Sequence, residues 1–460
     1  MIKKILIPSI LTLLIILLVH FHLIKLGKEG EWVWKYHKFN FWWRAFFPIS
    51  FFLLFFLLLF FIKDKLLPVS FILFFLLLFS FSLQVSFEYF SPIGMNRNVL
   101  VLSLPWMGGY FTEAMVSKCD RRYFRTYPQN VSYKHAKLHP PLNMLICRGC
   151  LWVFYRFPFL SHAILNFSHR TIYDASRAFK YMEEKLGWKS KYYERATLIF
   201  LGILLPFLAS LGVIPLYLLL KEKGNAFLLV AFYPLIPSLL LFSPGFEQIL
   251  PLFVILALYF FYQGGKNRFW AGFWTGLGML SSLSIGLIFL FLILLSLKER
   301  NKKESLLWMG GGFLLIHFLF WIFTGFSILN FLYRLLPAFT EKGRAGFVGV
   351  TAHRSYPFWV LYDPLEFLIF AGIPLSYLFL KGLGKMEKNY GWSFLAIFLF
   401  LNFSGISLSE VARLWMFLYP LFFLPAVEID EKNILIWLLL LQFLQSLFFQ
   451  ANLDVFTLNP

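Results

Sequence analysis

Long, uninterrupted runs of apolar residues constrain this chain more than any other feature. Three of them lie near the amino terminus, at residues 5–24, 48–62 and 66–83. A helix of about 20 residues crosses the roughly 30 Å hydrocarbon layer of a membrane, so these runs are long enough, or nearly so. They are apolar on every side, whereas strands of a membrane barrel alternate apolar and polar residues. The runs therefore predict an all-α, polytopic integral membrane protein.

Composition supports that class. The 460 residues are 59% hydrophobic and 21% aromatic, with a mean hydropathy of +0.71, whereas soluble domains are about 45–50% apolar. The first run follows Lys3 and Lys4, as the core of a signal peptide would, but no small-residue cleavage site comes after it. We therefore expect the first run to be retained as a membrane span.

About 13 transmembrane helices can be placed so that the loops alternate between the two faces, with the amino terminus in the cytoplasm. The expected spans are 5–24, 46–62, 66–86, 196–220, 225–242, 249–263, the short paired pieces 269–279 and 282–297, 305–324, 364–380, 391–403, 414–427 and 434–450. Every short loop assigned to the cytoplasm, except 428–433, has an excess of Lys and Arg, as the positive-inside rule requires.

This alternation divides the chain into three parts. Residues 1–86 hold the first three spans, 87–195 form a large outer loop, and 196–460 hold the remaining spans with outer loops at 326–363 and 404–413. All three outer loops fall on one face, so their polar groups can converge on a single cavity. Within the large loop, residues 142–165 predict an interfacial or re-entrant helix, and residues 171–195 predict an amphipathic helix.

The net charge of the chain limits the classes of molecule that it is expected to bind. Lys and Arg number 42 against 23 Asp and Glu, a net charge of +19. In a membrane protein this excess suggests lipid headgroups or phosphates and argues against nucleic acid, although loop orientation accounts for part of it. The three cysteines do not make a disulfide framework, and the spacing of Cys147 and Cys150 lacks the second ligand pair of a metal site. Whether those two cysteines pair is left open.

The stretch 105–141 holds the densest set of groups able to do chemistry. Its carboxylates are Glu113 and Asp120, and its imidazoles are His135 and His139. Several Arg and Lys residues lie among them, and a rigid Pro-Pro pair follows His139. We therefore expect this stretch to supply half of an active site, with the later outer loops supplying the other half.

Four elements carry a family resemblance. The sequence His139-Pro140-Pro141-Leu142 resembles the HPPL or HPPG element of the GT-C glycosyltransferases, which include the protein O-mannosyltransferases and the lipid A aminoarabinose transferases. The other three elements also look similar to bacterial members of that superfamily. They are the stretch 108–128, the sequence His353-Arg354-Ser355-Tyr356 with Trp359, and Ser404-Gly405 followed by residues 410–415.

The resemblance implies an inverting glycosyltransferase of the cell (inner) membrane. Such an enzyme moves a sugar from a polyprenyl-phosphate carrier to a lipid, glycan or protein acceptor on the extracytoplasmic face. The displacement needs a carboxylate to take the proton of the acceptor hydroxyl. It also needs cations to stabilise the departing phosphate, and the planar fork of Arg suits that role.

The sequence departs from the family where an early Asp of the first outer loop is expected, because Leu104-Pro105-Trp106 stands there. The base is then Glu113 or Asp120, which would share a face if the piece between them were helical, or less readily Glu88 or Glu31. The residues we expect to act in catalysis are Glu113, Asp120 and His139. The residues we expect to bind the donor phosphate or substrate are Tyr110, His353, Arg354, Tyr356, Glu410 and Arg413, with Glu247 a weaker candidate.

Several of these residues could instead have purely structural roles. A carboxylate such as Glu113 or Asp120 can be structural or solvated, His139 can simply end a turn, and Glu410 with Arg413 can anchor a helix start. No metal-ligand spacing is evident, although a weakly bound divalent ion (Mg or Mn) between Asp120 and His139 stays open.

Two other functions remain as alternatives. A lipid-linked glycan transporter would also have about a dozen spans, but transporters usually show repeated halves, and no such repeat is found. A lipid-linked oligosaccharide polymerase or ligase would also use outer-face Arg residues. Those enzymes tend to carry their main outer loop late in the chain, whereas the long loop here comes early.

Overall fold

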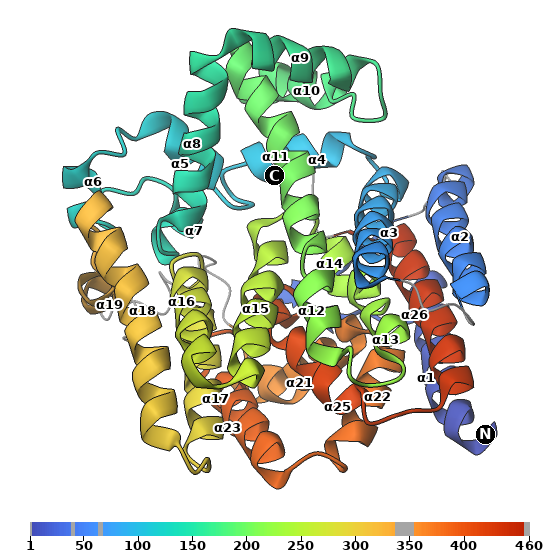
Figure 1. The fold of residues 1–460 in the computed structure, drawn as a ribbon. Helices are drawn as coiled ribbons and strands as arrows, with labels where there is room; N and C mark the ends of the chain where they lie inside the picture. The colour runs from blue at the N-terminus through green and yellow to red at the C-terminus, as the bar shows by residue number, and fades with distance from the viewer. Residues whose placement is uncertain (1, 38–41, 63–67, 336–353, 455–460) are drawn as a thin grey trace.

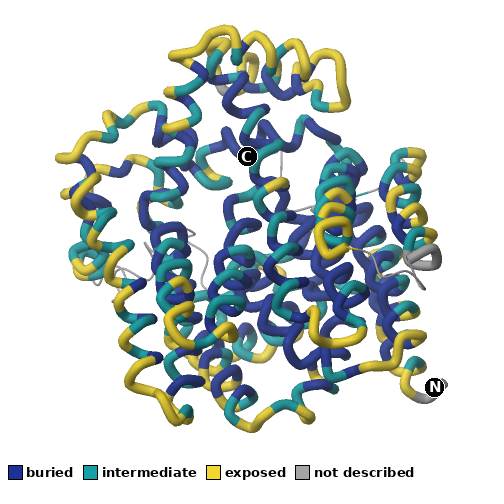
Figure 2. The backbone as a smooth tube through the Cα atoms, in the orientation of Figure 1, coloured by how far each residue is buried: buried dark blue, intermediate teal, exposed yellow. Residues whose placement is uncertain are grey.

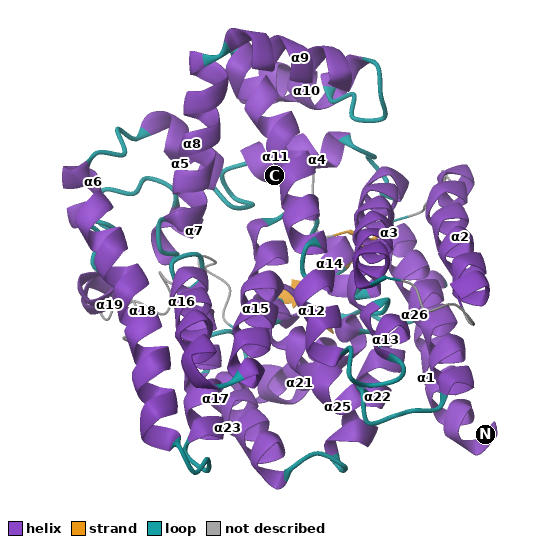
Figure 3. Ribbon diagram, in the orientation of Figure 1, coloured by secondary structure: helices purple, strands orange, loops and turns teal. Residues whose placement is uncertain are grey.

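The computed structural model describes residues 2–37, 42–62, 68–335 and 354–454, and these are mostly helical (Figure 3). The longer helices are α1 Ile2–His20, α2 Phe46–Ile62, α3 Val69–Phe90, α11 Tyr192–Ser210, α12 Val213–Leu220, α15 Leu250–Gln263, α16 Arg268–Met279, α17 Gly286–Ser296, α18 Lys302–Thr324, α21 Tyr356–Ala371, α22 Ile373–Leu383, α23 Lys388–Ser404 and α26 Lys432–Asn452. The helices of the central segment are α4 Asn96–Ser103, α5 Tyr110–Val116, α6 Arg121–Arg125, α7 Lys134–Leu138, α8 Leu142–Arg156, α9 Pro158–His169 and α10 Ser176–Leu186.

The remaining elements are short. The other α-helices are α13 Ala226–Val230, α14 Pro237–Leu241, α19 Ile328–Leu335, α24 Val411–Leu414 and α25 Phe423–Ala426, and the 3-10 helices are η1 Trp42–Ala45, η2 Tyr233–Leu235, η3 Phe246–Ile249, η4 Gly265–Asn267, η5 Leu283–Ile285 and η7 Met416–Phe422. Two antiparallel strand pairs complete the described residues: β1 Gly27–Lys28 with β2 Trp32–Val33, and β3 Lys35–Tyr36 with β4 Leu453–Asp454.

Five helical segments of the described residues are long and apolar enough to cross a membrane. They are Val69–Phe90, Tyr192–Leu220, Phe246–Gln263, Lys302–Thr324 and Lys432–Asn452, and the bent pair α21 and α22 makes a sixth if it is one span. In α18 only 11% of the apolar window is buried, and Leu307, Leu314 and Phe323 are exposed on it. Apolar faces left open in this way fit contact with lipid. The all-α class is confirmed, while the count of 13 spans stays a prediction.

Two expected spans differ in shape from straight helices. The span expected at 364–380 contains a bend of 107° between α21 and α22. Gly372 lies at the bend with φ +94, and a Cβ there would be 2.1 Å from Gln442 Nε2, so only glycine fits. The span expected at 225–242 is broken into α13, η2 and α14, because Pro234 and Pro237 stand at the starts of the last two pieces and cannot continue a helix.

The loops gather at two opposite ends of the helices (Figure 1). At one end lie loops that the alternation assigns to the cytoplasm, joined by the contacts Lys4–Glu431, Lys223–Glu428, Asn225–Asp430 and Lys385–Glu428. At the other end lie the loops assigned to the outer face, joined by the contacts Lys28–Ser355, Trp359–Glu31, Asn330–Arg125 and Arg354–Glu410. These contacts group the described loops that make them as the alternation predicts, and the side of the membrane on which each group lies stays a prediction.

The end that holds the loops assigned to the outer face, which we call the outer end, carries a helical cap. The cap is made of α8, α9 and α10 and lies over the start of α11 (Figure 1). The helix expected at 142–165 is two helices, because Pro158 begins α9 directly after α8 ends. The amphipathic helix expected at 171–195 covers only Ser176–Leu186, since Gly187 ends it in the left-handed conformation and Tyr192 begins α11. Much of the outer surface of this cap is exposed, whereas α26 in the interior of the molecule is mostly buried (Figure 2).

Candidate functional site

Three segments that are remote in sequence meet at one small pocket on the outer end. They are the start of α5, the turn that leads into α15, and the turn that carries α24. The pocket is lined by Val101, Leu102, Met107, Gly108, Tyr110, Phe242, Gly245, Phe246, Glu247 and Arg413. Its volume of about 30 Å³ has room for one or two water molecules, so binding of a larger ligand requires the side chains at its rim to move.

Glu247 is the carboxylate that lines this pocket. Its Oε1 lies 3.7 Å from His135 Nε2 and 4.0 Å from Arg413 Nε, and its side chain is 14% exposed. Sequence reasoning ranked Glu247 below the carboxylates of the central loop. The signal that could have promoted it is its place in a short Ser-Pro-Gly turn between two apolar runs, on the same outer face as the other candidates.

A row of alternating charges extends from Glu247. Arg413 Nη2 lies 3.0 Å from Glu410 Oε2, and Arg354 Nη2 lies 3.4 Å from Glu410 Oε1. Burial alone would lower the pKa of Arg413, but the neighbouring carboxylates of Glu410 and Glu247 raise it, so its guanidinium stays charged. Two guanidinium groups from different loops are thus held within one network, which could bind a phosphate.

The aromatic wall of the site comes from the central loop. The Tyr110 ring centroid is 5.7 Å from that of His135 and 5.9 Å from that of His139, and the two imidazoles are 4.7 Å apart. Just beyond them, Ser281 Oγ donates to Asn143 Oδ1 at 2.6 Å. Ser281, which lies between the short paired pieces 269–279 and 282–297, therefore supports the segment that carries His139.

Five of the predicted site residues are brought together, and others are not. Tyr110, His139, Arg354, Glu410 and Arg413 belong to the arrangement described above. Tyr356 does not line the pocket, and its hydroxyl donates to the carbonyl oxygen of Phe403 at 2.6 Å. His353 lies outside the described residues.

Glu113 lies away from the pocket and is fully bonded. Its side chain is 1% exposed and accepts hydrogen bonds from the Tyr123 hydroxyl at 2.6 Å and from the backbone N–H groups of Ser132 at 2.9 Å and Tyr133 at 3.1 Å. These bonds tie two parts of the loop together. The geometry gives Glu113 a structural position, and a catalytic role for it stays a prediction.

Asp120 is exposed and caps α6, where it accepts the backbone N–H of Tyr123 at 2.7 Å. The condition under which Glu113 and Asp120 would share a helical face is not met, because α5 ends at Val116 and α6 begins only after Asp120. The two carboxylates therefore lie on different elements.

The two less favoured bases are also engaged elsewhere. Glu88 is fully buried and accepts hydrogen bonds from Asn98 Nδ2 at 2.7 Å and from Ser243 Oγ. Glu31 accepts hydrogen bonds from the Ser355 backbone and from Trp359 Nε1, at 2.7 and 2.6 Å. Burial alone would raise the pKa of Glu31, but the hydrogen bonds from Lys28, Ser355 and Trp359 hold it at about 2.

Two buried carboxylates of α21 hold the turn that presents Arg413. Asp363 accepts the backbone N–H of Ser409 at 3.2 Å, and Glu366 accepts that of Ala412 at 3.4 Å. Ser409 and Glu410 both have φ in the left-handed region, at 65° and 53°, a conformation that non-glycine residues rarely adopt. The carboxylates thus bond the backbone on either side of an unfavourable turn. Sequence reasoning missed them, although ionisable groups inside an apolar run mark sites worth attention.

Among the residues that the structure describes, no three His, Cys, Asp or Glu side chains are grouped as a metal site would need. The Asp120 carboxylate, considered above as a partner of His139 for a divalent ion, caps α6 in the structure, and the ion stays a prediction.

Comparison of the chain with known proteins gives no match, either to a family model, to a curated protein or to a solved structure. The GT-C resemblance therefore rests on the residues quoted for it.

The two carboxylates of the central loop should differ in their effect on stability. We expect Glu113→Ala to lower the free energy of unfolding by about 3 kcal/mol, because three buried or partly buried donors lose their acceptor. Asp120→Ala should cost about 1 kcal/mol, the usual loss of a helix cap. Thermal unfolding of the purified variants in detergent measures both, and equal shifts would contradict the structural position assigned to Glu113.

His139 should make stability depend on pH. Burial lowers its pKa to about 3, from an ordinary value of 6.5; His135 also lowers it and Glu247 opposes. Between those two pH values the unfolded chain binds one more proton than the folded chain, so stability falls as the pH falls, by up to about 1.4 kcal/mol per pH unit.

The low pKa of Glu31 also makes stability fall as the pH falls, at more acidic pH. The contribution of His139 is therefore measured as the difference in slope between the parent protein and a variant that lacks this imidazole. His139→Asn should show a shallower loss of stability than the parent between pH 6.5 and 4. Identical slopes in the two proteins would show that His139 is protonated in the folded state.

Proposed function

We propose that this protein is a membrane glycosyltransferase of GT-C type that transfers a sugar from a polyprenyl-phosphate carrier to a lipid, glycan or protein acceptor. The observation that carries the proposal is the contact network of Glu247, Arg413, Glu410 and Arg354 beside Tyr110 and His139. It assembles a pocket-lining carboxylate and two guanidinium groups from three separate loops at one end of the helices.

The guanidinium groups suit the donor. A polyprenyl-phosphate sugar carries one negative charge on its phosphodiester, and Arg413 at the pocket and Arg354 beside Glu410 can pair with that charge. In the absence of donor, Glu410 keeps both cations paired, which avoids an uncompensated buried charge. Donor phosphate would then compete with Glu410 for Arg413.

Glu247 suits the role of base better than Glu113 or Asp120, because it is the carboxylate that faces the pocket. As the acceptor oxygen attacks the anomeric carbon, its proton passes to Glu247 and a new C–O bond forms. The bond between the anomeric carbon and the phosphate oxygen breaks, and the oxygen keeps the electron pair. Arg413 then stabilises the charge on the leaving polyprenyl phosphate, and the configuration at the carbon inverts.

The proposal also keeps the expected setting, with about 13 spans in the cell membrane and the pocket on the extracytoplasmic face. Five apolar helices of sufficient length support a membrane location. The Lys and Arg excess of the loops at the opposite end supports the orientation.

The test is consumption of labelled donor. The purified protein in lipid bilayers is incubated with a panel of radiolabelled polyprenyl-monophosphate sugars, with matching polyprenyl-diphosphate sugars in parallel, and a membrane extract as acceptor. Consumption of a monophosphate donor is expected. Consumption of the diphosphate donors alone would favour an oligosaccharide polymerase or ligase, and consumption of neither would reject transfer from these carriers.

A further inference from the structure

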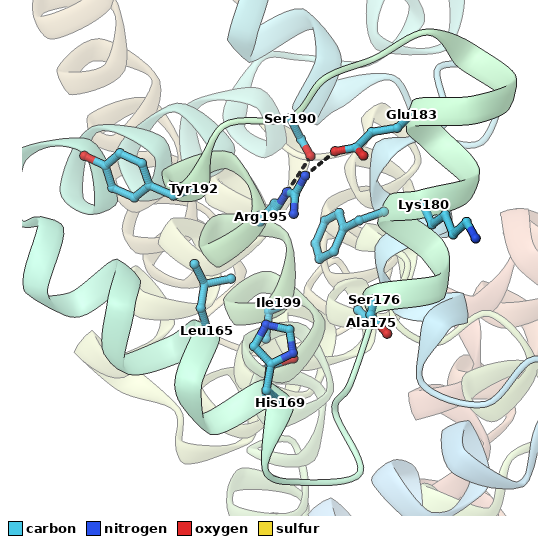
Figure 4. Close-up of a pocket in the computed structure, with 12 residues that line it drawn as sticks. Leu165, His169, Ala175, Ser176, Lys180, Glu183, Ser190, Tyr192, Arg195 and Ile199 are labelled. Atoms are coloured by element: carbon cyan, nitrogen blue, oxygen red, sulfur yellow. Dashed lines mark hydrogen bonds and ion pairs between the residues drawn. The ribbon is translucent and has the colours of Figure 1, made fainter.

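The larger of the two pockets described here lies in the helical cap, between α9, α10 and the start of α11 (Figure 4). Its volume is about 280 Å³, and it shares no lining residue with the pocket of Glu247. No part of the proposed transfer reaction uses it.

The pocket combines an apolar floor with charges of both signs. Phe179 and Ile199 form buried parts of the floor. The Arg195 guanidinium lies 5.2 Å from the centre of the Phe179 ring, donates from Nε to Ser190 Oγ at 2.9 Å, and forms an ion pair with Glu183. Figure 4 shows Glu183, Ser190 and Arg195 joined in this way. Lys180 stands at the rim, with 75% of its side chain exposed and its Nζ 3.6 Å from Glu184 Oε1.

The position of the pocket points to a lipid. Arg195 lies in the first turn of α11, at the start of the candidate span Tyr192–Leu220. The neighbouring helices expose large aromatic residues, with Trp152 59% and Phe159 67% exposed. Exposed aromatic side chains at the end of a span are typical of the headgroup layer. The pocket therefore opens at the level where lipid headgroups lie.

We propose that this pocket binds the headgroup of phosphatidylethanolamine. The lipid phosphate pairs with Arg195 and Lys180, its ammonium donates hydrogen bonds to Glu183, and its glycerol end rests on the apolar floor. A zwitterion satisfies both members of the Glu183–Arg195 pair. Phosphatidylglycerol has no cation for Glu183, and the methylated ammonium of phosphatidylcholine has no N–H to donate.

The test is lipid binding to the full-length protein, delipidated in detergent and titrated with the three phospholipids carrying the same acyl chains, with native mass spectrometry as the readout. We expect phosphatidylethanolamine to bind about tenfold more tightly than phosphatidylcholine, the effect of one charge-assisted hydrogen bond. Soluble phosphoethanolamine should compete weakly if the headgroup is the recognised part, since it lacks the floor contact. Competition as strong as that of the whole lipid would assign the pocket to a soluble phosphate compound and overturn the lipid proposal.

Two pairs of variants locate the binding. Glu183→Gln should remove the preference for phosphatidylethanolamine, whereas Glu222→Gln, at an exposed carboxylate outside the pocket lining, should keep it. Lys180→Ala, a change at an exposed side chain that leaves the fold intact, should weaken all three phospholipids alike, and Lys185→Ala should not. Equal binding of the three lipids by the parent protein, or the same loss in Glu222→Gln as in Glu183→Gln, would overturn the proposal. None of these outcomes depends on transferase activity.

Discussion

Glu247→Gln is expected to slow sugar transfer by a factor of roughly 10²–10⁴, the usual loss when a general base is removed. The amide keeps the size of the side chain and can still accept a hydrogen bond, but it cannot take a proton from the acceptor hydroxyl. Single-turnover transfer with saturating donor measures the effect.

The matched control is Asp120→Asn. Asp120 is exposed and caps α6, and Asn caps a helix about as well as Asp, so turnover should stay close to that of the parent. Full turnover in Glu247→Gln would reject Glu247 as the base. If Asp120→Asn lost activity instead, the base would be the carboxylate that sequence reasoning placed in the central loop.

The second large effect is expected from Arg413→Met, which removes the cation shared by Glu247 and Glu410. Glu410 then keeps only Arg354 as a partner and Glu247 keeps only the imidazole of His135, so the two carboxylates repel each other and we expect the free energy of unfolding to fall by about 3–5 kcal/mol. Transfer should fall by roughly 10²-fold or more, since the departing phosphate loses its nearest positive charge. Thermal unfolding and donor consumption measure the two effects separately.

A double variant separates folding from function. Adding Glu410→Gln to Arg413→Met removes the repulsion between the carboxylates of Glu410 and Glu247, so part of the lost stability should return while transfer stays lost. Arg122→Met, at an exposed arginine of α6 on the same end of the molecule, serves as the control for loss of positive charge. Recovery of transfer together with stability would show that Arg413 has only a structural role.

Hydropathy and charge predicted those features of the protein that depend on averages over many residues, namely the helical class and the grouping of the loops. Apolar runs and the Lys and Arg content of the loops were enough to assign the helical class and to group the loops at two ends. They also placed Tyr110, His139, Arg354, Glu410 and Arg413 on one face, and the structure brings these five residues into one arrangement.

Which carboxylate lines the pocket and which has a structural position could not be predicted, because the answer depends on contacts between residues distant in sequence. Glu113 looks reactive in the sequence, but the N–H groups of Ser132 and Tyr133, about 20 residues later, donate to its Oε2, and the Tyr123 hydroxyl donates to its Oε1. Glu247 looks incidental, and only the approach of Arg413 from the far end of the chain places it in a charged pocket. The bend at Gly372 likewise depends on Gln442 in another helix.

The most direct test of the central claim uses a polyprenyl monophosphate that carries a diazirine next to its phosphate. Illumination of the purified protein in bilayers with this probe, followed by peptide mapping, shows where the phosphate binds. The account predicts labelled peptides around Tyr110, Glu247 and Arg413, with labelling suppressed by excess unlabelled donor. Labelling confined to the cap pocket of α9 to α11, or to the opposite end of the helices, would contradict it.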